Sequence, residues 1–255
     1  MSTASHSADG DAIRVLAFDV FGTVVDWRGS IINELSAAWP LLDAAAMADA
    51  WRAGYQPAMA KVRGGQLGWT KIDDLHRGIL EELLPRFGLE HLDEAERRHL
   101  NRVWHRLDPW PDSVAGLERM RERFILTPMS NGNIGLLTEM AKRAGLPWDC
   151  VLSAEVFRHY KPDPETYLGV CDVFDIAPSQ MLMVAAHVDD LVAAGQCGCR
   201  TAFVARPLEY GPDVTPRSAA PGQFDFQATD MVDLAAQLER VQPEPYPARR
   251  RQTGA

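Results

Sequence analysis

The sequence has little cysteine, no long apolar run and a deficit of positive charge. Four cysteines in 255 residues are too few for a disulfide framework in a chain of this length. The Cys197-Gly198-Cys199 pair has neither a usual metal nor a usual redox spacing, so we expect buried apolar residues there. No apolar run approaches the roughly 18 residues of a membrane span, and the polar N-terminus lacks the apolar segment of a signal peptide. We therefore expect a cytoplasmic protein with no membrane partner.

Positive charge is the scarcer sign in this chain. Lysine and arginine together number 26, against 35 aspartates and glutamates, which gives a formal net charge of −9. Nucleic-acid-binding domains normally carry a basic face, so nucleic acid is not an expected partner. An anionic ligand would have to be captured by a few well-placed cations, because the overall field repels it.

Short apolar segments that end in polar clusters recur along the chain and predict β-strands over 13–19, 124–130, 150–154, 180–186 and 201–206. Their near-continuous hydrophobicity is typical of parallel strands that are covered on both faces. Apolar residues at helical spacing predict helices over 112–122, 133–144, 163–174, 189–197 and 230–240. Strands that alternate with helices indicate an α/β fold built on a doubly wound parallel sheet.

The region from 29 to 108 differs from the rest of the chain. It shows helical patterns over 30–39, 44–62, 71–87 and 93–106 and almost no strand signal. It also contains or borders five of the seven tryptophans, namely Trp27, Trp39, Trp51, Trp69 and Trp104. We predict a helical cap inserted after the first strand, with the tryptophans mainly in its core and one or two facing the cleft. The predicted domains are a core of 12–28 and 109–240, the cap of 29–108, a disordered tail of 1–11 and a loose tail of 241–255.

Polar side chains follow four of the predicted strands, at the point where each strand ends. Asp19 ends the first strand, Ser130 ends the second, Lys161 follows the third, and an acidic pair, Asp189 and Asp190, follows the fourth. The carboxyl ends of parallel strands lie side by side at one edge of a sheet, where α/β proteins bind ligands. One nucleophile-sized carboxylate, one hydroxyl, one ammonium and one acidic pair are therefore expected to converge.

This arrangement resembles the haloacid dehalogenase superfamily, whose first motif is an apolar strand followed by Asp-x-x-Gly-Thr. The chain reads Asp19-Val20-Phe21-Gly22-Thr23 at that point. The later motifs of the superfamily are a strand-terminal serine or threonine, a lysine and an acidic pair, which match Ser130, Lys161 and Asp189-Asp190. The resemblance covers roughly residues 13–240 and implies the fold predicted above.

Phe21 points to one branch of that superfamily. Most members are phosphatases with a second aspartate at this position, which protonates the leaving alcohol, whereas Phe21 has no proton to give. A chloride or bromide leaving group needs no proton. The chain therefore resembles the (S)-2-haloacid dehalogenases, which the cap arginine Arg52, the sequence Ser130-Asn131-Gly132 and Tyr167 also match. The pattern departs from that family at His187, where typical members have asparagine.

The resemblance implies hydrolysis of short 2-haloalkanoic acids without a cofactor or resident metal. Asp19 would displace the halide and form an ester, which water would hydrolyse, so the substrate carbon inverts once. Lys161 would keep Asp19 ionised, and Thr23 would fix its rotamer. Arg52 and Asn131 would stabilise the halide.

The remaining roles concern the substrate and the water. Ser130 and the backbone amides of Val20 and Phe21 would hold the substrate carboxylate. Asp190 would polarise the water or hold Lys161, and His187 would share the first task or favour small halides such as fluoride. Tyr167 would orient Lys161 or the substrate. A homodimer is common in the resembling family.

Three alternatives stay open at this point. A magnesium-dependent phosphatase could use Asp19 with Asp189 or Asp190, and a phosphonate hydrolase would need a Schiff-base lysine in the cap, for which Lys61 and Lys71 are present. A second alternative is hydrolysis of another alkyl electrophile, such as a strained ring amine, by the same aspartyl ester. A third is a binding protein without catalysis, which would not need the complete set of four motifs.

Overall fold

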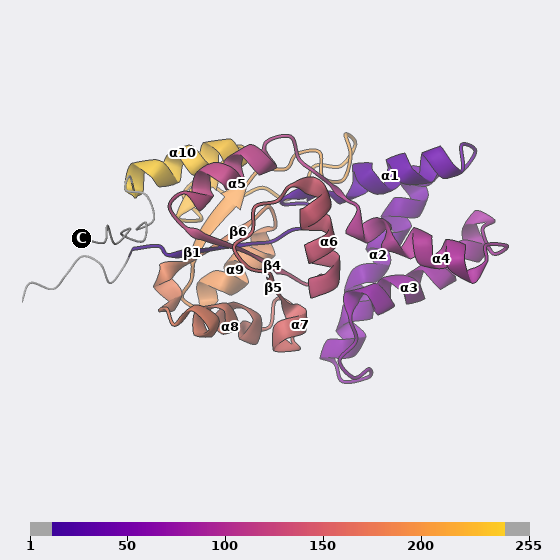
Figure 1. Ribbon diagram of the computed structural model, residues 1–255, viewed down its shortest axis with the longest axis horizontal. Coiled ribbons are helices and arrows are strands. Elements are labelled where there is room, and N and C mark those ends of the chain that lie inside the picture. Colours follow the sequence, from indigo (N-terminus) through magenta and orange to yellow (C-terminus); the bar gives the residue numbers. More distant parts are fainter. Residues whose placement is uncertain (1–11, 243–255) are drawn as a thin grey trace, which may run out of the picture.

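The computed structural model describes residues 12–242. The predicted tail of 1–11, and that of 241–255 from residue 243 on, lie outside the described residues. Figure 1 shows two adjoining bodies, a core in which helices flank a sheet and a cap made of helices.

The core sheet has six parallel strands in the order β5-β4-β1-β6-β7-β8. Their bounds are β1 Val15–Phe18, β4 Ile125–Ser130, β5 Leu152–Ser153, β6 Met181–Ala185, β7 Arg200–Val204 and β8 Phe226–Ala228. The predicted doubly wound α/β fold is thus confirmed. The sequence did not predict β8, because its three residues, Phe-Gln-Ala, are too few to give a period, and the predicted strand over 150–154 is reduced to two residues at the sheet edge.

Both faces of the sheet are buried, as the continuous apolar runs predicted. Leu16 and Phe18 of β1 pack in one hydrophobic cluster, and Val15 and Ala17 pack in the other, because successive side chains of a strand point to opposite faces. The helices of the first face are α5 Ser113–Arg121, α6 Ile134–Ala144 and α10 Met231–Val241, and those of the second are α8 Pro164–Phe174 and α9 Val188–Gln196. In Figure 1, α5 and α10 lie above the sheet, and α8 and α9 lie below it.

The cap consists of α1 Trp27–Ala38, α2 Ala44–Arg63, α3 Ile72–Leu83 and α4 Glu94–Asn101, with 3₁₀ turns at Leu84–Phe87 and Arg102–His105. A short antiparallel ladder of β2 Val25–Asp26 and β3 Asp108–Pro109 joins the two chain segments where the cap begins and ends. This ladder lies at the predicted domain boundaries, although no strand was predicted there. Trp51 and Trp104 are fully buried in the cap, as expected of core tryptophans.

Polar contacts hold the cap against the core. Arg63 of α2 pairs with Asp163 at 2.6 Å, and Lys71 pairs with Glu155 at 2.8 Å. The buried His105 contacts Asp73 of the cap at 3.0 Å through Nε2 and Glu139 of α6 at 2.9 Å through Nδ1. These contacts place the side of the cap that carries α2 beside the carboxyl ends of the core strands.

The structure also bears on the cysteines, on metal sites and on membrane-spanning helices. All four cysteines are free, and Cys199 is buried whereas Cys197 is only partly so, which corrects the expectation that both are buried. Within residues 12–242, no cluster of three or more His, Cys, Asp or Glu side chains is arranged to hold a metal ion, and no helix is long and apolar enough to cross a bilayer.

Candidate active site

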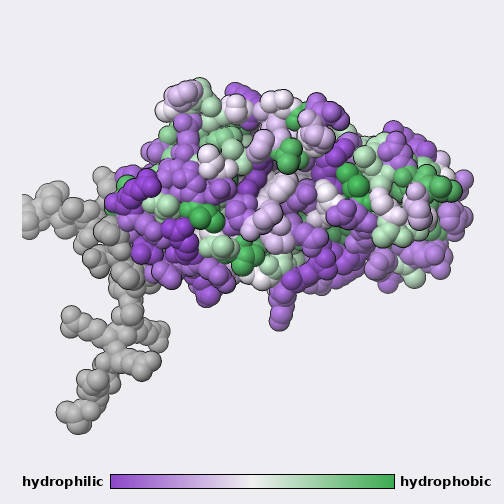
Figure 2. Space-filling model, turned by 90° about the horizontal axis from the view of Figure 1, so that it is seen from above, coloured by the Kyte–Doolittle hydropathy of each residue, from purple (hydrophilic) through white to green (hydrophobic). Residues whose placement is uncertain are grey.

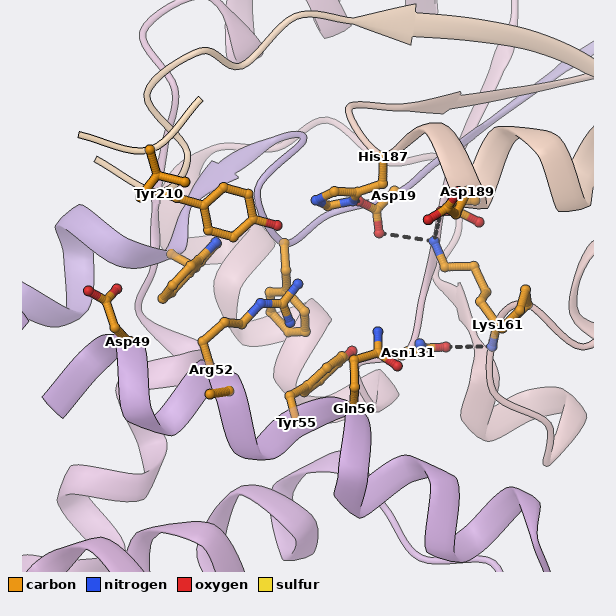
Figure 3. Close-up of a pocket in the computed structure, with 16 residues that line it drawn as sticks. Asp19, Asp49, Arg52, Tyr55, Gln56, Asn131, Lys161, His187, Asp189 and Tyr210 are labelled. Atoms are coloured by element: carbon orange, nitrogen blue, oxygen red, sulfur yellow. Dashed lines mark hydrogen bonds and ion pairs between the residues drawn. The ribbon is translucent and has the colours of Figure 1, made fainter. Parts of the chain in front are cut away.

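The sheet order brings the predicted residues to one edge. Asp19 follows β1, Ser130 ends β4, His187 and Asp190 follow β6, and Lys161 lies in the loop before α8. Because β4, β1 and β6 are neighbours in the sheet, these loops meet, and α2 of the cap closes the space above them. The resulting pocket has a volume of about 690 Å³, and Figure 3 shows side chains from both bodies pointing into it.

Asp19 is nearly buried, with 7% of its surface exposed. Its Oδ1 accepts a hydrogen bond of 2.9 Å from Nζ of Lys161, and its Oδ2 accepts one of 2.7 Å from the Thr23 hydroxyl. Burial alone would raise the pKa of Asp19, but the Lys161 ammonium and the protonated ring of His187 hold this pKa well below its usual value. Asp19 is therefore an ionised carboxylate with little water around it.

Lys161 joins the two acids of the site. Its Nζ donates to Asp190 as well as to Asp19, and its backbone N–H donates to Oδ1 of Asn131 at 2.7 Å. Burial would lower the pKa of Lys161, but the charges of Asp19 and Asp190 raise it above its usual value. The lysine is thus a fixed cation that holds both carboxylates in place.

Tyr167 lies behind Asp190 rather than in the pocket. Its hydroxyl donates to Oδ1 of Asp190 at 2.6 Å, and the residue has no exposed surface. Burial, and then the Asp190 charge, raise the pKa of Tyr167, so the phenol is a stable donor. The structure therefore places Tyr167 where it orients Asp190, in contrast to the expected contact with Lys161 or the substrate.

His187 stands between two carboxylates. Its Nδ1 lies 3.0 Å from Oδ2 of Asp19, and its Nε2 lies 2.9 and 3.0 Å from the two carboxylate oxygens of Glu209. Burial would lower the pKa of His187, but its hydrogen bonds to Asp19 and Glu209 raise this pKa to about 10. His187 is therefore an imidazolium at neutral pH.

Glu209 is a site residue that the sequence did not reveal. It lies in the loop after β7 with 1% of its surface exposed, and Oε1 accepts a hydrogen bond of 3.2 Å from the indole of Trp27. Gly22 makes this position possible, because a Cβ there would lie 2.1 Å from Oε1 of Glu209. An acid in a loop is usually solvated, so nothing in the local sequence signals its burial.

Arg52 extends from α2 of the cap into the pocket (Figure 3). Its guanidinium carbon lies 4.5 Å from the centroid of the Tyr55 ring and 5.5 Å from that of Trp27, so two aromatic rings hold the cation. Among the residues that the structure describes, none accepts a hydrogen bond from its buried Nη1. Arg52 thus lines the pocket with a cation, and its buried Nη1 still lacks an acceptor among the described residues.

Phe21 forms an apolar wall beside Asp19. It is 3% exposed, lines the pocket and packs edge-on against Tyr55 and Trp104, with ring centroids 6.5 and 5.6 Å away. At this position the site offers a hydrophobic surface and no acid. Tyr55, like Tyr210 and Gln56, lines the pocket without having been predicted from the sequence.

The remaining predicted residues lie on the core side of the pocket. Asn131 lines it, whereas Ser130 is fully buried, and its Oγ accepts a hydrogen bond of 3.1 Å from the backbone of Gly132. The side chain of Val20 is also fully buried, so only its backbone is positioned to bind a ligand. Neither the Val20 nor the Phe21 backbone amide has an acceptor among residues 12–242.

The two cap lysines of the phosphonate hydrolase alternative do not belong to this pocket. Neither Lys61 nor Lys71 is among the described residues that line it. Lys71 pairs with Glu155, whose hydrogen bond and charge raise the pKa of the lysine. A Schiff-base lysine needs a lowered pKa, so this environment suits Lys71 to an ion pair rather than to that chemistry.

Comparisons with known proteins agree with the geometry. A family model for haloacid dehalogenase-like hydrolases matches residues 13–198. A solved L-2-haloacid dehalogenase is 47% identical, with a TM-score of 0.85 over 89% of this chain and 100% of the other. A solved defluorinating L-2-haloacid dehalogenase is 45% identical, with a TM-score of 0.85 over 89% of this chain and 95% of the other. The (S)-2-haloacid dehalogenase 4A of Burkholderia cepacia is 27% identical over 213 residues, 78% of this chain and 87% of that protein.

Proposed function

The chain belongs to the haloacid dehalogenase-like hydrolase family, and we propose that it hydrolyses haloacetates and short (S)-2-haloalkanoic acids to 2-hydroxy acids. One observation carries this proposal. An ionised, nearly buried carboxylate, Asp19, faces the same pocket as a guanidinium, Arg52, whose Nη1 has no partner among the described residues. A nucleophile and an anion site in one pocket are what displacement of a halide requires.

In the first step, a lone pair of Asp19 attacks the carbon that bears the halogen. The C–O bond forms as the C–halogen bond breaks, and the electron pair leaves with the halide. Arg52 and Asn131 receive the halide, while the backbone amides of Val20 and Phe21 bind the substrate carboxylate. The Ser130 hydroxyl, which is fully buried, holds the backbone of Gly132 instead.

In the second step, water attacks Cγ of Asp19 and releases the hydroxy acid. Asp190 takes a proton from the water and returns it to the departing oxygen, so that one proton per turnover is finally lost from Asp19. Tyr167 and Lys161 hold the carboxylate of Asp190 in place for this transfer. Only the first step touches the substrate carbon, so its configuration inverts once.

The leaving group separates this proposal from a phosphatase on the same scaffold. An alcohol leaving group needs a proton. Phosphatases of this superfamily have an acid at the position of Phe21, whereas here an aromatic ring fills that position. The lack of an acid at this position therefore favours halide release over phosphoryl transfer.

Halide-ion release from a panel of (R)- and (S)-2-haloacids and haloacetates tests the proposal. We expect chloride and bromide release from the (S) acids, unchanged by EDTA, with inverted hydroxy acids as products. Asp19→Asn should abolish release, whereas Asp172→Asn, an equivalent change at an exposed position of α8, should not. Phosphate release that requires magnesium, with no halide release from any member of the panel, would overturn the proposal.

Fluoride is a separate question within the same panel. One similar solved protein is described as defluorinating, and the cationic His187 lines the pocket in which the halide departs. We propose that His187 favours small halides, including that of fluoroacetate. An unchanged ratio of fluoride to chloride release in His187→Asn would refute this role.

The expected homodimer and cytoplasmic location stay predictions. Figure 2 shows hydrophobic residues gathered over the cap end of the molecule, within an otherwise mixed surface. Leu41, in the turn between α1 and α2, is fully exposed. We propose this end of the cap as the surface of a homodimer, for which light scattering of wild type and Leu41→Glu gives the test.

A further inference from the structure

The protonation of His187 follows from its surroundings alone. Each of its ring nitrogens lies within 3.0 Å of a carboxylate oxygen, from Asp19 on one side and Glu209 on the other. An ionised carboxylate only accepts hydrogen bonds, so both nitrogens must carry a proton. The five charged side chains then alternate in sign through the site, in the order Glu209, His187, Asp19, Lys161 and Asp190.

The two oxygens of Asp19 are not equivalent. Oδ2 accepts two hydrogen bonds, from the Thr23 hydroxyl and from Nδ1 of His187, whereas Oδ1 accepts one, from Lys161. A carboxylate oxygen has about two lone-pair sites, so Oδ2 is fully occupied and Oδ1 keeps one free. Oδ1 is therefore the oxygen that attacks, and Oδ2 becomes the carbonyl oxygen of the ester with both donors still beside it.

We propose that Glu209 is a positioning residue that keeps His187 doubly protonated while Asp19 is an ester, so that His187 and Thr23 together stabilise the oxyanion on Oδ2. The inference rests on the proposed hydrolysis of 2-haloacids. When the ester forms, Asp19 loses its charge and no longer supports the proton on Nδ1. Glu209 is then the one carboxylate in hydrogen-bond contact with His187 among residues 12–242.

This assignment fixes how the electron pairs and the proton move during ester hydrolysis. Water attacks Cγ, and the electron pair of the C=O bond moves to Oδ2, where Nδ1–H and the Thr23 hydroxyl face it. The pair returns as the bond from Cγ to Oδ1 breaks, and Asp190 gives the departing oxygen the proton that it took from water. Donors placed in advance where charge develops are a large source of catalysis.

The pocket contains other ionisable groups whose charges also act on His187. The other ionisable groups that line the pocket with it are Asp49, Arg52, Tyr55, Lys161, Asp189, Asp190 and Tyr210. Lys161 and Asp190 form an ion pair with each other. Asp189 is largely exposed and pairs with Arg217. Glu209, in contrast, is almost fully buried and points both oxygens at Nε2, so its charge is the least screened.

Glu209→Gln tests this role in single-turnover experiments with an (S)-2-chloro acid. We expect the first halide burst at nearly the wild-type rate, because Asp19 still supports the proton of His187 before the ester forms. Ester hydrolysis should then be slowed about tenfold to a hundredfold near pH 9, and only a few-fold near pH 6. Mass spectrometry should find the ester on the peptide that contains Asp19, and Glu209→Asp should recover part of the alkaline rate.

Two further variants separate a positioning role from a structural one. His187→Gln removes the charge directly and should also accumulate ester, and adding Glu209→Gln to it should cause no further loss, because Glu209 acts through His187. Glu118→Gln, an exposed change on α5, should behave as wild type. If Glu209→Gln does not melt cooperatively, the ester burst of His187→Gln decides.

The results that would overturn the inference are distinct from those that would overturn the function. Equal slowing of burst and hydrolysis at every pH, additive losses in the double variant, or no ester in either variant would refute the role of Glu209 while wild type still releases halide. Wild type that releases no halide would refute the proposed function itself.

Discussion

His76 gives a stability prediction that the structure makes quantitative. This cap residue of α3 is completely buried, its ring stacks on Trp104 with centroids 4.1 Å apart, and among the described residues no atom bonds to either of its ring nitrogens. Burial lowers the pKa of His76 from its usual 6.5 to about 3, and Arg52 adds to this while Asp73 opposes it. The folded protein therefore holds His76 neutral where the unfolded chain would protonate it.

The sign follows from proton binding. Between the folded pKa near 3 and the unfolded pKa of 6.5, the unfolded state binds one more proton at His76, so the free energy of unfolding falls as the pH falls. Taking the pH from 7 to 5 should cost about 2 kcal/mol at this residue alone, since each pKa unit corresponds to about 1.4 kcal/mol. That loss is a sizeable part of the stability of an ordinary domain.

His76→Leu isolates this effect. The substitution removes the titrating ring, whose two nitrogens have no hydrogen-bond partner among residues 12–242, at nearly constant volume, and any change in packing is independent of pH. Denaturant unfolding of both proteins at a series of pH values gives the difference in unfolding free energy. We expect this difference to move by about 2 kcal/mol in favour of His76→Leu between pH 7 and pH 5. A difference that stays constant with pH would show that folding leaves the pKa of His76 unchanged, which would refute the reasoning.

Three further predictions concern the active site. Arg52→Ala should weaken inhibition by product chloride and lower kcat by about a hundredfold or more, as measured by halide-release kinetics, because it removes a pocket cation whose Nη1 has no partner among residues 12–242; unaltered chloride inhibition would contradict that role. Tyr167→Phe should lower kcat by about tenfold to a hundredfold with KM nearly constant, because Asp190 loses a hydrogen bond worth about 1.5–3 kcal/mol; a change confined to KM would instead indicate substrate contact. Gly22→Ala should lower the melting temperature and the rate of ester hydrolysis together, because φ is +85° there and the new Cβ would displace Glu209; a variant with wild-type melting and kinetics would refute the need for glycine.

Local patterns identified most of the fold because they report on burial. Continuous apolar runs such as that of β1 exist where both faces of a strand are covered, and amphipathic periods such as that of α2 exist where one face is. The cap was predicted for the same reason, from helical periods without strands between them. The strand β8 was not predicted, because Phe226–Ala228 is too short to show a period. In the described sheet it pairs with β7.

The pairing of Asp19 with Lys161 could be predicted because chemistry restricts what stands at the ends of parallel strands. A carboxylate at Asp19 and an ammonium at Lys161 are costly to bury unless they pair, and the sheet order places them 2.9 Å apart. Tyr167 was noticed only through the resemblance to the (S)-2-haloacid dehalogenases, and it was given a different partner, because sequence spacing does not distinguish Lys161 from Asp190 as the group that its hydroxyl reaches.

The sequence by itself determined the α/β core, the inserted cap and the polar residues at the strand ends, because the apolar periods and the strand-end residues are local properties of the chain. Only the tertiary structure decided which neighbouring side chains contact these polar residues. Glu209, a loop acid with no local signal, is placed against His187 by the return of the chain after β7 and by the missing Cβ of Gly22. Charge and protonation at this site depend on distances between segments far apart in sequence, and such distances exist only once the chain is folded.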